Sequence, residues 1–254
     1  MSGQRTVLVT GGGRRIGAGI ATSLATRGYH IVIHYNSSSE GAEQIRRSIR
    51  DAGGTCDIVA AELTDRAALT SLIDRVRDMV GPVDTLINNA SAFALDHLDT
   101  LDWELWDRHL AVNLAAPAFL SRDFARQTEV SDGVIINIID QKVDNLNPDF
   151  LSYTISKVGL KGLTQVLAMA LAPRIRVCGL SPGLTLISGR QTPESFERAF
   201  RSTPLKRGST IKELVRGVEF IIDTPSYSGQ VLTIDGGESL QRRARDVYFD
   251  TAEE

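Results

Sequence analysis

Short apolar runs alternate with stretches of helical periodicity along almost the whole of this 254-residue chain. Seven runs are candidate strands, at residues 7–10, 31–34, 56–60, 85–88, 134–139, 175–180 and 231–234. Most of them are continuously apolar, as parallel strands covered on both faces should be. The stretches between them repeat apolar residues at helical spacing, for example Leu69, Leu72, Ile73 and Val76. The alternation predicts an α/β fold, a doubly wound seven-stranded parallel sheet with helices on both faces.

Composition narrows the class of protein further. The chain is 42% hydrophobic and 23% charged, and no repeat or linker interrupts it, so residues 1–254 are predicted to form one domain. A net charge of −3 argues against a nucleic-acid surface, and no apolar run has the length of a membrane span. Two isolated cysteines, the absence of metal-ligand spacing and a strand close to the first residue predict a cytoplasmic protein without a metal site.

Tyr153 and Lys157 are spaced by four residues, which places them on one face of a helix. This helix is expected to begin near Ser152, a candidate N-cap, and to end before Pro173. An ammonium group beside the phenol would lower its pKa from about 10 toward neutral pH. Such a pair usually belongs to a solvent-exposed helix face, so a catalytic role depends on motifs elsewhere in the chain.

A glycine-rich turn, residues 10–17, follows the first strand and opens the first helix. Glycine in that position lets the backbone approach a pyrophosphate group, which then lies at the helix N-terminus. Tight turns need glycine for other reasons as well, but a strand before the turn and a helix after it favour a dinucleotide site.

The end of the second strand indicates which dinucleotide is bound. An NAD site has an acidic side chain there, whereas this chain has Tyr35, Asn36, Ser37 and Ser38. Arg14 in the glycine-rich turn can instead contact a ribose 2′-phosphate. The pattern therefore predicts NADP(H).

These motifs together resemble those of the short-chain dehydrogenase/reductase family over nearly the whole chain. The resemblance implies that Asn113 holds a water in a proton relay and that Tyr153 and Lys157 are the catalytic pair on a Rossmann fold. Asn113 alone could equally be a capping or core amide. The residues expected at the cofactor are Gly11, Arg14, Arg15, Ile16, Tyr35, Asn36, Ser37, Ser38, Glu62, Leu63, Asn89, Ala90, Lys157, Pro182 and Gly183.

Departures from the common family pattern are similar to the branch of pteridine reductases and dihydromonapterin reductases. Arg15 stands where most members have glycine, and Asp140 stands where most have serine. The resemblance implies that Arg15 reaches cofactor and pterin, that Ser91 touches the substrate and that Phe93 stacks on the pterin ring. With Asp140 and Tyr153, these residues form the predicted substrate site.

The chemistry expected from this resemblance is hydride transfer from NADPH to a pterin ring, with Tyr153 as proton donor and Asp140 orienting substrate and tyrosine. Two interpretations without a functional role remain, in which Asp140 is a solvated loop residue and Phe93 a core residue. Two other functions also stay open, a reductase of a non-pterin carbonyl or alcohol and a non-catalytic nucleotide-binding regulator.

The last parts of the chain are less regular. Residues 184–210, which contain Gly189, are expected to form a substrate lid, and the charged tail 238–254 to be partly disordered or used in assembly. Lys142 is left between a solvated cation and a substrate contact, and Trp103 and Trp106 are assigned to packing or an interface. The family resemblance implies a homotetramer.

Overall fold

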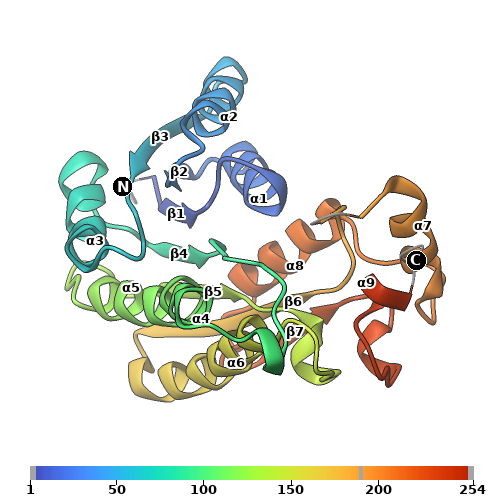
Figure 1. Ribbon diagram of the computed structural model, residues 1–254. Helices are drawn as coiled ribbons and strands as arrows, with labels where there is room; N and C mark the ends of the chain where they lie inside the picture. The colour runs from blue at the N-terminus through green and yellow to red at the C-terminus, as the bar shows by residue number, and fades with distance from the viewer. Residues whose placement is uncertain (1–3, 189–190, 251–254) are drawn as a thin grey trace.

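The computed structural model describes residues 4–188 and 191–250, which form one seven-stranded sheet with helices on both faces (Figure 1). The strands are β1 (Thr6–Thr10), β2 (His30–Tyr35), β3 (Thr55–Ala60), β4 (Thr85–Asn88), β5 (Gly133–Ile138), β6 (Ile175–Pro182) and β7 (Val231–Ile234). All neighbouring pairs are parallel and the order is β3-β2-β1-β4-β5-β6-β7. The predicted fold class is therefore confirmed.

Helices cover both faces of the sheet. The longer ones are α1 (Arg15–Thr26), α2 (Ser39–Asp51), α3 (Arg66–Val80), α4 (Trp103–Leu110), α5 (Ala116–Ala125), α6 (Leu151–Leu171), α7 (Pro193–Ser202) and α8 (Ile211–Asp223). Shorter turns are η1 (Leu98–Thr100), the π-helical η2 (Ala111–Ala115), η3 (Gln141–Asp144), η4 (Glu238–Leu240) and α9 (Val247–Asp250).

Two apolar layers hold the sheet between the helices. One joins α1, α2 and α8 to one face and includes Ile20, Leu24 and Leu214. The other joins α3 and α5 to the opposite face and includes Leu72 and Phe124. Because both faces are buried, the strands are apolar without alternation, which is the pattern seen in the sequence.

The order of the strands reverses between β1 and β4. From β1 the chain adds strands outward to β3 on one side, and from β4 it adds them outward to β7 on the other. In open parallel sheets, ligands bind beyond the carboxyl ends of the strands at such a switch point. The segments that follow β1, β4 and β5 meet at this edge of the sheet.

The start of α6 differs from the sequence prediction. The residue before the helix is Phe150, in the left-handed region at φ 56°, and its side chain makes no capping hydrogen bond. Ser152 is buried inside the first turn, and its N–H donates to both carboxylate oxygens of Asp96 at 3.2 Å. The N-cap prediction is wrong because the helix already begins at Leu151, which places Ser152 inside the first turn. The predicted end before Pro173 is correct.

The tail also differs from expectation. As far as residue 250 it is folded, with η4 and α9, and α9 lies beside α7 (Figure 1). Arg243 donates to Ser202 Oγ, and Arg245 to Asp149. The prediction of partial disorder is therefore wrong for 238–250, and residues 251–254 lie outside the described part of the chain.

The segment 184–210 is less irregular than predicted. It contains α7, which Thr192 caps by accepting from Ser195 N–H at 3.1 Å. Gly189 lies outside the described residues.

None of the helices in the described ranges combines the length and apolar content needed to cross a bilayer.

Candidate active site

A cleft of about 1300 Å³ opens at the switch point of the sheet. This exceeds the roughly 300–1000 Å³ of a usual small-molecule pocket, so a dinucleotide and a second ring fit together. Every predicted cofactor and substrate residue lines it. Asn113 is instead fully buried in η2.

The first side of the cleft, here called the cofactor half, is built around the glycine-rich turn. Gly11 has φ +62°, and its N–H faces His34 Nδ1 at 3.3 Å. Asn89 fixes the turn, because its Nδ2 donates to the carbonyls of Thr10 at 2.9 Å and Gly11 at 3.2 Å. A side chain at Gly17 would lie 2.6 Å from Asn89 Nδ2 and from the Gly11 carbonyl. Only a turn of this composition brings the backbone so close to the start of α1.

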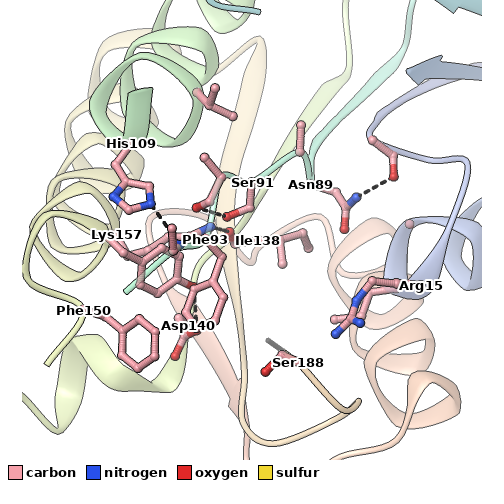
Figure 2. Close-up of a pocket in the computed structure, with 18 of the residues that line it drawn as sticks. Arg15, Asn89, Ser91, Phe93, His109, Ile138, Asp140, Phe150, Lys157 and Ser188 are labelled. Atoms are coloured by element: carbon pink, nitrogen blue, oxygen red, sulfur yellow. Dashed lines mark hydrogen bonds between the residues drawn. The ribbon is translucent and has the colours of Figure 1, made fainter. Parts of the chain in front are cut away.

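Arg15 keeps a left-handed conformation at φ 54° although it is not glycine. This conformation costs an L-residue roughly 1–2 kcal/mol. Its guanidinium donates to the Ile187 carbonyl at 2.9 Å and lies across the cleft from Phe93 and Asp140 (Figure 2). Burial and the neighbouring Arg14 lower the pKa of Arg15. Arg15 thus joins the glycine-rich turn to the segment after β6.

Polar groups after β2 and β3 complete the cofactor half. Arg14 and the serines Ser37 and Ser38 lie along its wall, and the Asn36 amide donates to Glu62 Oε2 at 2.5 Å. The Thr64 N–H donates to Glu62 Oε1 and lowers the pKa of that carboxyl. The remaining predicted cofactor residues on this side are Ile16, Tyr35, Leu63 and Ala90.

The opposite side, here called the substrate half, contains Asp140 and Tyr153. The Tyr153 hydroxyl donates to Asp140 Oδ2 at 2.7 Å, and the Lys142 N–H donates to Asp140 Oδ1 at 2.9 Å. Burial raises the pKa of Asp140, so the carboxyl is easier to protonate than an ordinary aspartate. The interpretation of Asp140 as a solvated loop residue is therefore wrong.

Lys157 lies on the same face of α6 as Tyr153, one turn further along. Its Nζ donates to the Ile138 carbonyl at 2.9 Å and lies 5.7 Å from the centroid of the Tyr153 ring. Burial lowers the pKa of Lys157 to about 8. Burial, and then the carboxylate of Asp140, raise the pKa of Tyr153 well above 10. The predicted lowering of the tyrosine pKa is wrong here, and the phenol stays protonated at neutral pH.

Asn113 acts on the loop after β4. Its Oδ1 accepts from the Ala92 N–H at 2.8 Å, and its Nδ2 donates to the Ala92 carbonyl at 2.9 Å and to Ser156 Oγ at 3.0 Å. It lies in a π-helical turn, a feature frequent at functional sites. The side chain therefore fixes the segment that carries Ser91 and Phe93.

Phe93 is not a core residue, since 46% of its surface is exposed. Its ring stacks on Phe150 at a centroid distance of 4.7 Å and meets the Tyr153 ring edge-on at 4.8 Å. Figure 2 shows Phe93, Phe150 and Asp140 together on one side of the cleft. An aromatic surface therefore lies directly beside the tyrosine hydroxyl.

Two buried titratable groups in or beside the substrate half were not predicted, because no sequence motif marks them. His109 is buried and pairs Nδ1 with Ser152 Oγ at 2.6 Å, while Nε2 accepts from the Ala94 N–H, and burial lowers its pKa. Glu238 is 3% exposed and accepts from the Leu184 N–H, and burial raises its pKa to about 8. Pro182 and Gly183 lie next to Leu184 at the end of β6.

Comparison with known proteins decides the family. Residues 5–197 match the family model described as short chain dehydrogenase. The chain belongs to the short-chain dehydrogenase family. The predicted enzyme class, an oxidoreductase of this family, is thereby confirmed.

Individual relatives of this short-chain dehydrogenase carry several names. The FolM alternative dihydrofolate reductase 1 of Brucella suis, solved in complex with NADP, is 43% identical, with a TM-score of 0.92 over 97% of this chain and 99% of that one. A 3beta-hydroxysteroid dehydrogenase 1 of Eggerthella lenta is 31% identical over 93% of this chain and 94% of its own. A dihydromonapterin reductase of Enterobacter sp. (strain 638) is 25% identical over 93% and 98%. The predicted similarity to the branch that includes dihydromonapterin reductase is confirmed.

Proposed function

We propose that this short-chain dehydrogenase is an NADPH-dependent reductase of a pterin ring. The observation that carries the proposal is the 2.7 Å hydrogen bond from the Tyr153 hydroxyl to Asp140, beside the exposed ring of Phe93. In either protonation state Asp140 keeps an acceptor oxygen for the ring N–H and amino groups of a pterin, and its ionised form repels the alkoxide that forms when a ketone is reduced. The Brucella suis relative, named as an alternative dihydrofolate reductase and bound to NADP, supports the same conclusion.

The cofactor half suits a phosphorylated dinucleotide. The turn around Gly11 and the N-terminus of α1 would hold the pyrophosphate, and Arg14 with Ser37 and Ser38 would hold a 2′-phosphate. Asn36 is engaged with Glu62 and would contribute less directly. Bound there, NADPH supplies the hydride.

The proton follows from the state of the Tyr153–Asp140 pair. When Asp140 is protonated, which its raised pKa favours, its O–H can donate to the tyrosine oxygen. The phenol proton is then free to pass to a ring nitrogen of the substrate as the adjacent ring carbon receives hydride. Asp140 returns a proton to the phenolate and is reprotonated from solvent. Lys157 would hold the ribose of the cofactor and balance the negative charge that develops.

The proposed ring site lies between aromatic and polar groups. The open face of Phe93 would stack on the pterin, with Phe150 supporting the other side, and Ser91 and Arg15 would contact the ring from opposite sides of the cleft. Residues 184–210 are proposed as the lid over this site, within a single domain.

Assembly and location are proposals of the same kind. A homotetramer is supported by exposed apolar side chains on α5 and α6, namely Phe119, Ile155, Val158, Val166 and Met169. A cytoplasmic location is supported by the two free, buried cysteines Cys56 and Cys178.

The test is a steady-state comparison of NADPH oxidation with a dihydropterin, dihydrofolate and a panel of aromatic and aliphatic ketones, and Tyr153→Phe serves as the matched control. We expect turnover with a dihydropterin that the control loses. Turnover of ketones without any dihydropterin-dependent NADPH oxidation would show that the substrate is a simple carbonyl compound and not a pterin. The absence of turnover with every substrate would favour a non-catalytic role.

A further inference from the structure

The C-terminal segment, residues 245–249, reaches the substrate half of the cleft. Asp246, Val247 and Tyr248 line the cleft together with Phe93 and Asp140. Val247 is 6% exposed. Asp246 and Tyr248 contact residues between 142 and 150, none of which belongs to the glycine-rich turn. A charged tail thus supplies a wall of the cleft.

A buried ion pair holds this segment in place. Lys142, which is 4% exposed, directs its Nζ to Asp246 Oδ2 at 2.6 Å and to Asn147 Oδ1 at 2.5 Å. Asp246 Oδ1 in turn accepts from the Tyr248 N–H at 3.0 Å. A lysine ammonium group loses hydration in such a place and needs a paired anion. The pair therefore fixes both the position of Lys142 and the start of α9.

A second anchor involves Asp149 and Arg245, the residue before Asp246. Asp149 is 1% exposed, and its carboxylate accepts from Arg245 Nε and from the Asp246 N–H at 2.7 Å. His97 Nδ1 lies 3.3 Å from the same carboxylate. Lys142 and Asp149 both belong to the segment between Asp140 and Tyr153. The tail is therefore fastened to the connection between the two candidate catalytic residues.

Aromatic contacts extend from the tail to the tyrosine. Tyr248 meets the Phe150 ring edge-on at 6.0 Å, and Phe249 lies 6.4 Å from it. Phe150 stacks on Phe93, and Phe93 contacts Tyr153. A change in the tail can therefore alter the ring surface on which a substrate would stack, without touching the cofactor half.

We propose that residues 245–249 form the outer wall of the substrate half and determine which substrates bind, with the Lys142–Asp246 ion pair as the group that positions this wall. The proposal rests on the proposed function only in that the cleft must accept a flat ring beside Tyr153. It predicts that the tail controls substrate affinity and leaves cofactor affinity unchanged.

The electrostatic surroundings give the ion pair a second, measurable role. Asp246 acts electrostatically on Asp140 after β5, Tyr153 in α6 and Glu238 in η4, and it pairs with Lys142 in η3. Its negative charge contributes to the raised pKa values of Asp140 and Tyr153. Neutralising Asp246 while Lys142 keeps its charge should favour ionised Asp140 and so move the alkaline limb of kcat to lower pH.

The experiment compares Tyr248→Ala and Asp246→Asn with Asp223→Asn, which removes a carboxylate from an exposed ion pair with Arg27. KM and kcat for a dihydropterin are measured against pH, and the NADPH Kd by fluorescence titration. We expect a KM about tenfold higher in both tail variants, corresponding to roughly 1.4 kcal/mol, with an NADPH Kd within twofold of wild type. The control should match wild type.

Two further measurements separate positioning from loss of folding. The double variant Lys142→Gln, Asp246→Asn keeps a neutral hydrogen bond and leaves no unpaired charge, so it should restore KM to within about threefold of wild type. Tyr248→Ala removes no charge and should fold even if Asp246→Asn does not. An unchanged KM in Tyr248→Ala, or an NADPH Kd that rises together with KM, would overturn the proposal.

Failure of the pterin reaction is distinguishable from failure of this inference. A wild-type enzyme that reduces no pterin contradicts the proposed function alone. The KM of each variant relative to wild type is then measured with 9,10-phenanthrenequinone, a flat dicarbonyl, beside the NADPH Kd. Tail variants that change neither its KM nor its relative rate against a small aliphatic ketone would contradict the role of the wall.

Discussion

The two halves of the cleft are built in different ways. In the cofactor half, backbone turns directly after β1 and β4 carry most of the structure, and Asn89 closes them with two hydrogen bonds. In the substrate half, side chains from η3, α6, η4 and the C-terminal segment converge, and several of them are buried acids or bases. The comparison teaches that the cofactor half is built mainly from backbone turns at the ends of strands, whereas the substrate half is assembled from the side chains of distant segments.

The largest effect is expected from Tyr153→Phe, which removes only the hydroxyl that donates to Asp140. The loss of the proton donor should reduce kcat by about 10³-fold, as for other general acids. Because the change lies in the substrate half, the NADPH Kd should stay within twofold of wild type. Stopped-flow measurement of hydride transfer checks this, and a comparable loss of NADPH binding would break the division into halves.

Glu238→Gln tests the buried acids of the substrate half. Burial, aided by Asp140 and Asp246, raises the folded-state pKa of Glu238 to about 8 from an ordinary 4.5. The folded protein therefore holds an extra proton between these values, and the free energy of unfolding falls as pH rises through that window. Glutamine does not titrate and can still accept from Leu184, so the variant should be more stable than wild type by roughly 2–4 kcal/mol at pH ~9 and equal to it near pH ~4.

The matched control is Glu62→Gln in the cofactor half, where hydrogen bonds from Thr64 lower the pKa of the carboxyl. Its ionised form is the favoured one, so any effect of this substitution should have the opposite sign and be lost as pH falls. Urea unfolding as a function of pH measures both. A stability difference for Glu238→Gln that does not change with pH would contradict the account.

Arg14→Ala should act on the cofactor half alone. Loss of one contact to a 2′-phosphate should raise the NADPH Kd about tenfold and leave the NADH Kd unchanged. Arg126→Ala, on the exposed end of α5, is the control for a lost positive charge. Fluorescence titration with both dinucleotides decides the outcome, and equal weakening of NADH and NADPH would rule out a 2′-phosphate contact.

Arg15→Gly should have the smallest effect on stability and the opposite sign. Glycine accepts the left-handed conformation at φ 54°, so the apo protein should gain roughly 0.5–1 kcal/mol. The KM for substrate should rise, because the guanidinium that reaches across the cleft is lost. Thermal unfolding and steady-state kinetics check the two parts, and a destabilised variant would show that the Ile187 contact outweighs the strain.

The sequence predicted the cofactor half well because each of its parts lies in a short motif, although contacts such as that of Asn89 with Thr10 join distant positions. Residues 10–17 carry the turn, its glycines and Arg15 in one stretch, and most strands are continuous apolar runs. Tyr153 and Lys157 could be paired for the same reason, since four residues of helix determine their common face. The parallel sheet could be predicted from the alternation of apolar runs with stretches of helical periodicity.

The substrate half was predicted less completely because its contacts are long-range. Lys142 and Asp246 are separated by 104 positions, and no periodicity links them. Asp96, 56 positions before Ser152, accepts from the N–H of that residue in the first turn of α6, and no local pattern links the two. The only local signal for the tail was the apolar and aromatic run Val247, Tyr248 and Phe249 within a charged segment.

The central claim is that Asp140 makes this cleft a pterin site rather than a general carbonyl site. Its most direct test is Asp140→Ser, measured as the ratio of kcat/KM for a dihydropterin to kcat/KM for an aromatic ketone. We predict that the dihydropterin value falls about 10²-fold while the ketone value stays or rises, because the serine hydroxyl tolerates an alkoxide. A variant that reduces dihydropterin as well as wild type, or loses both activities equally, would contradict the account.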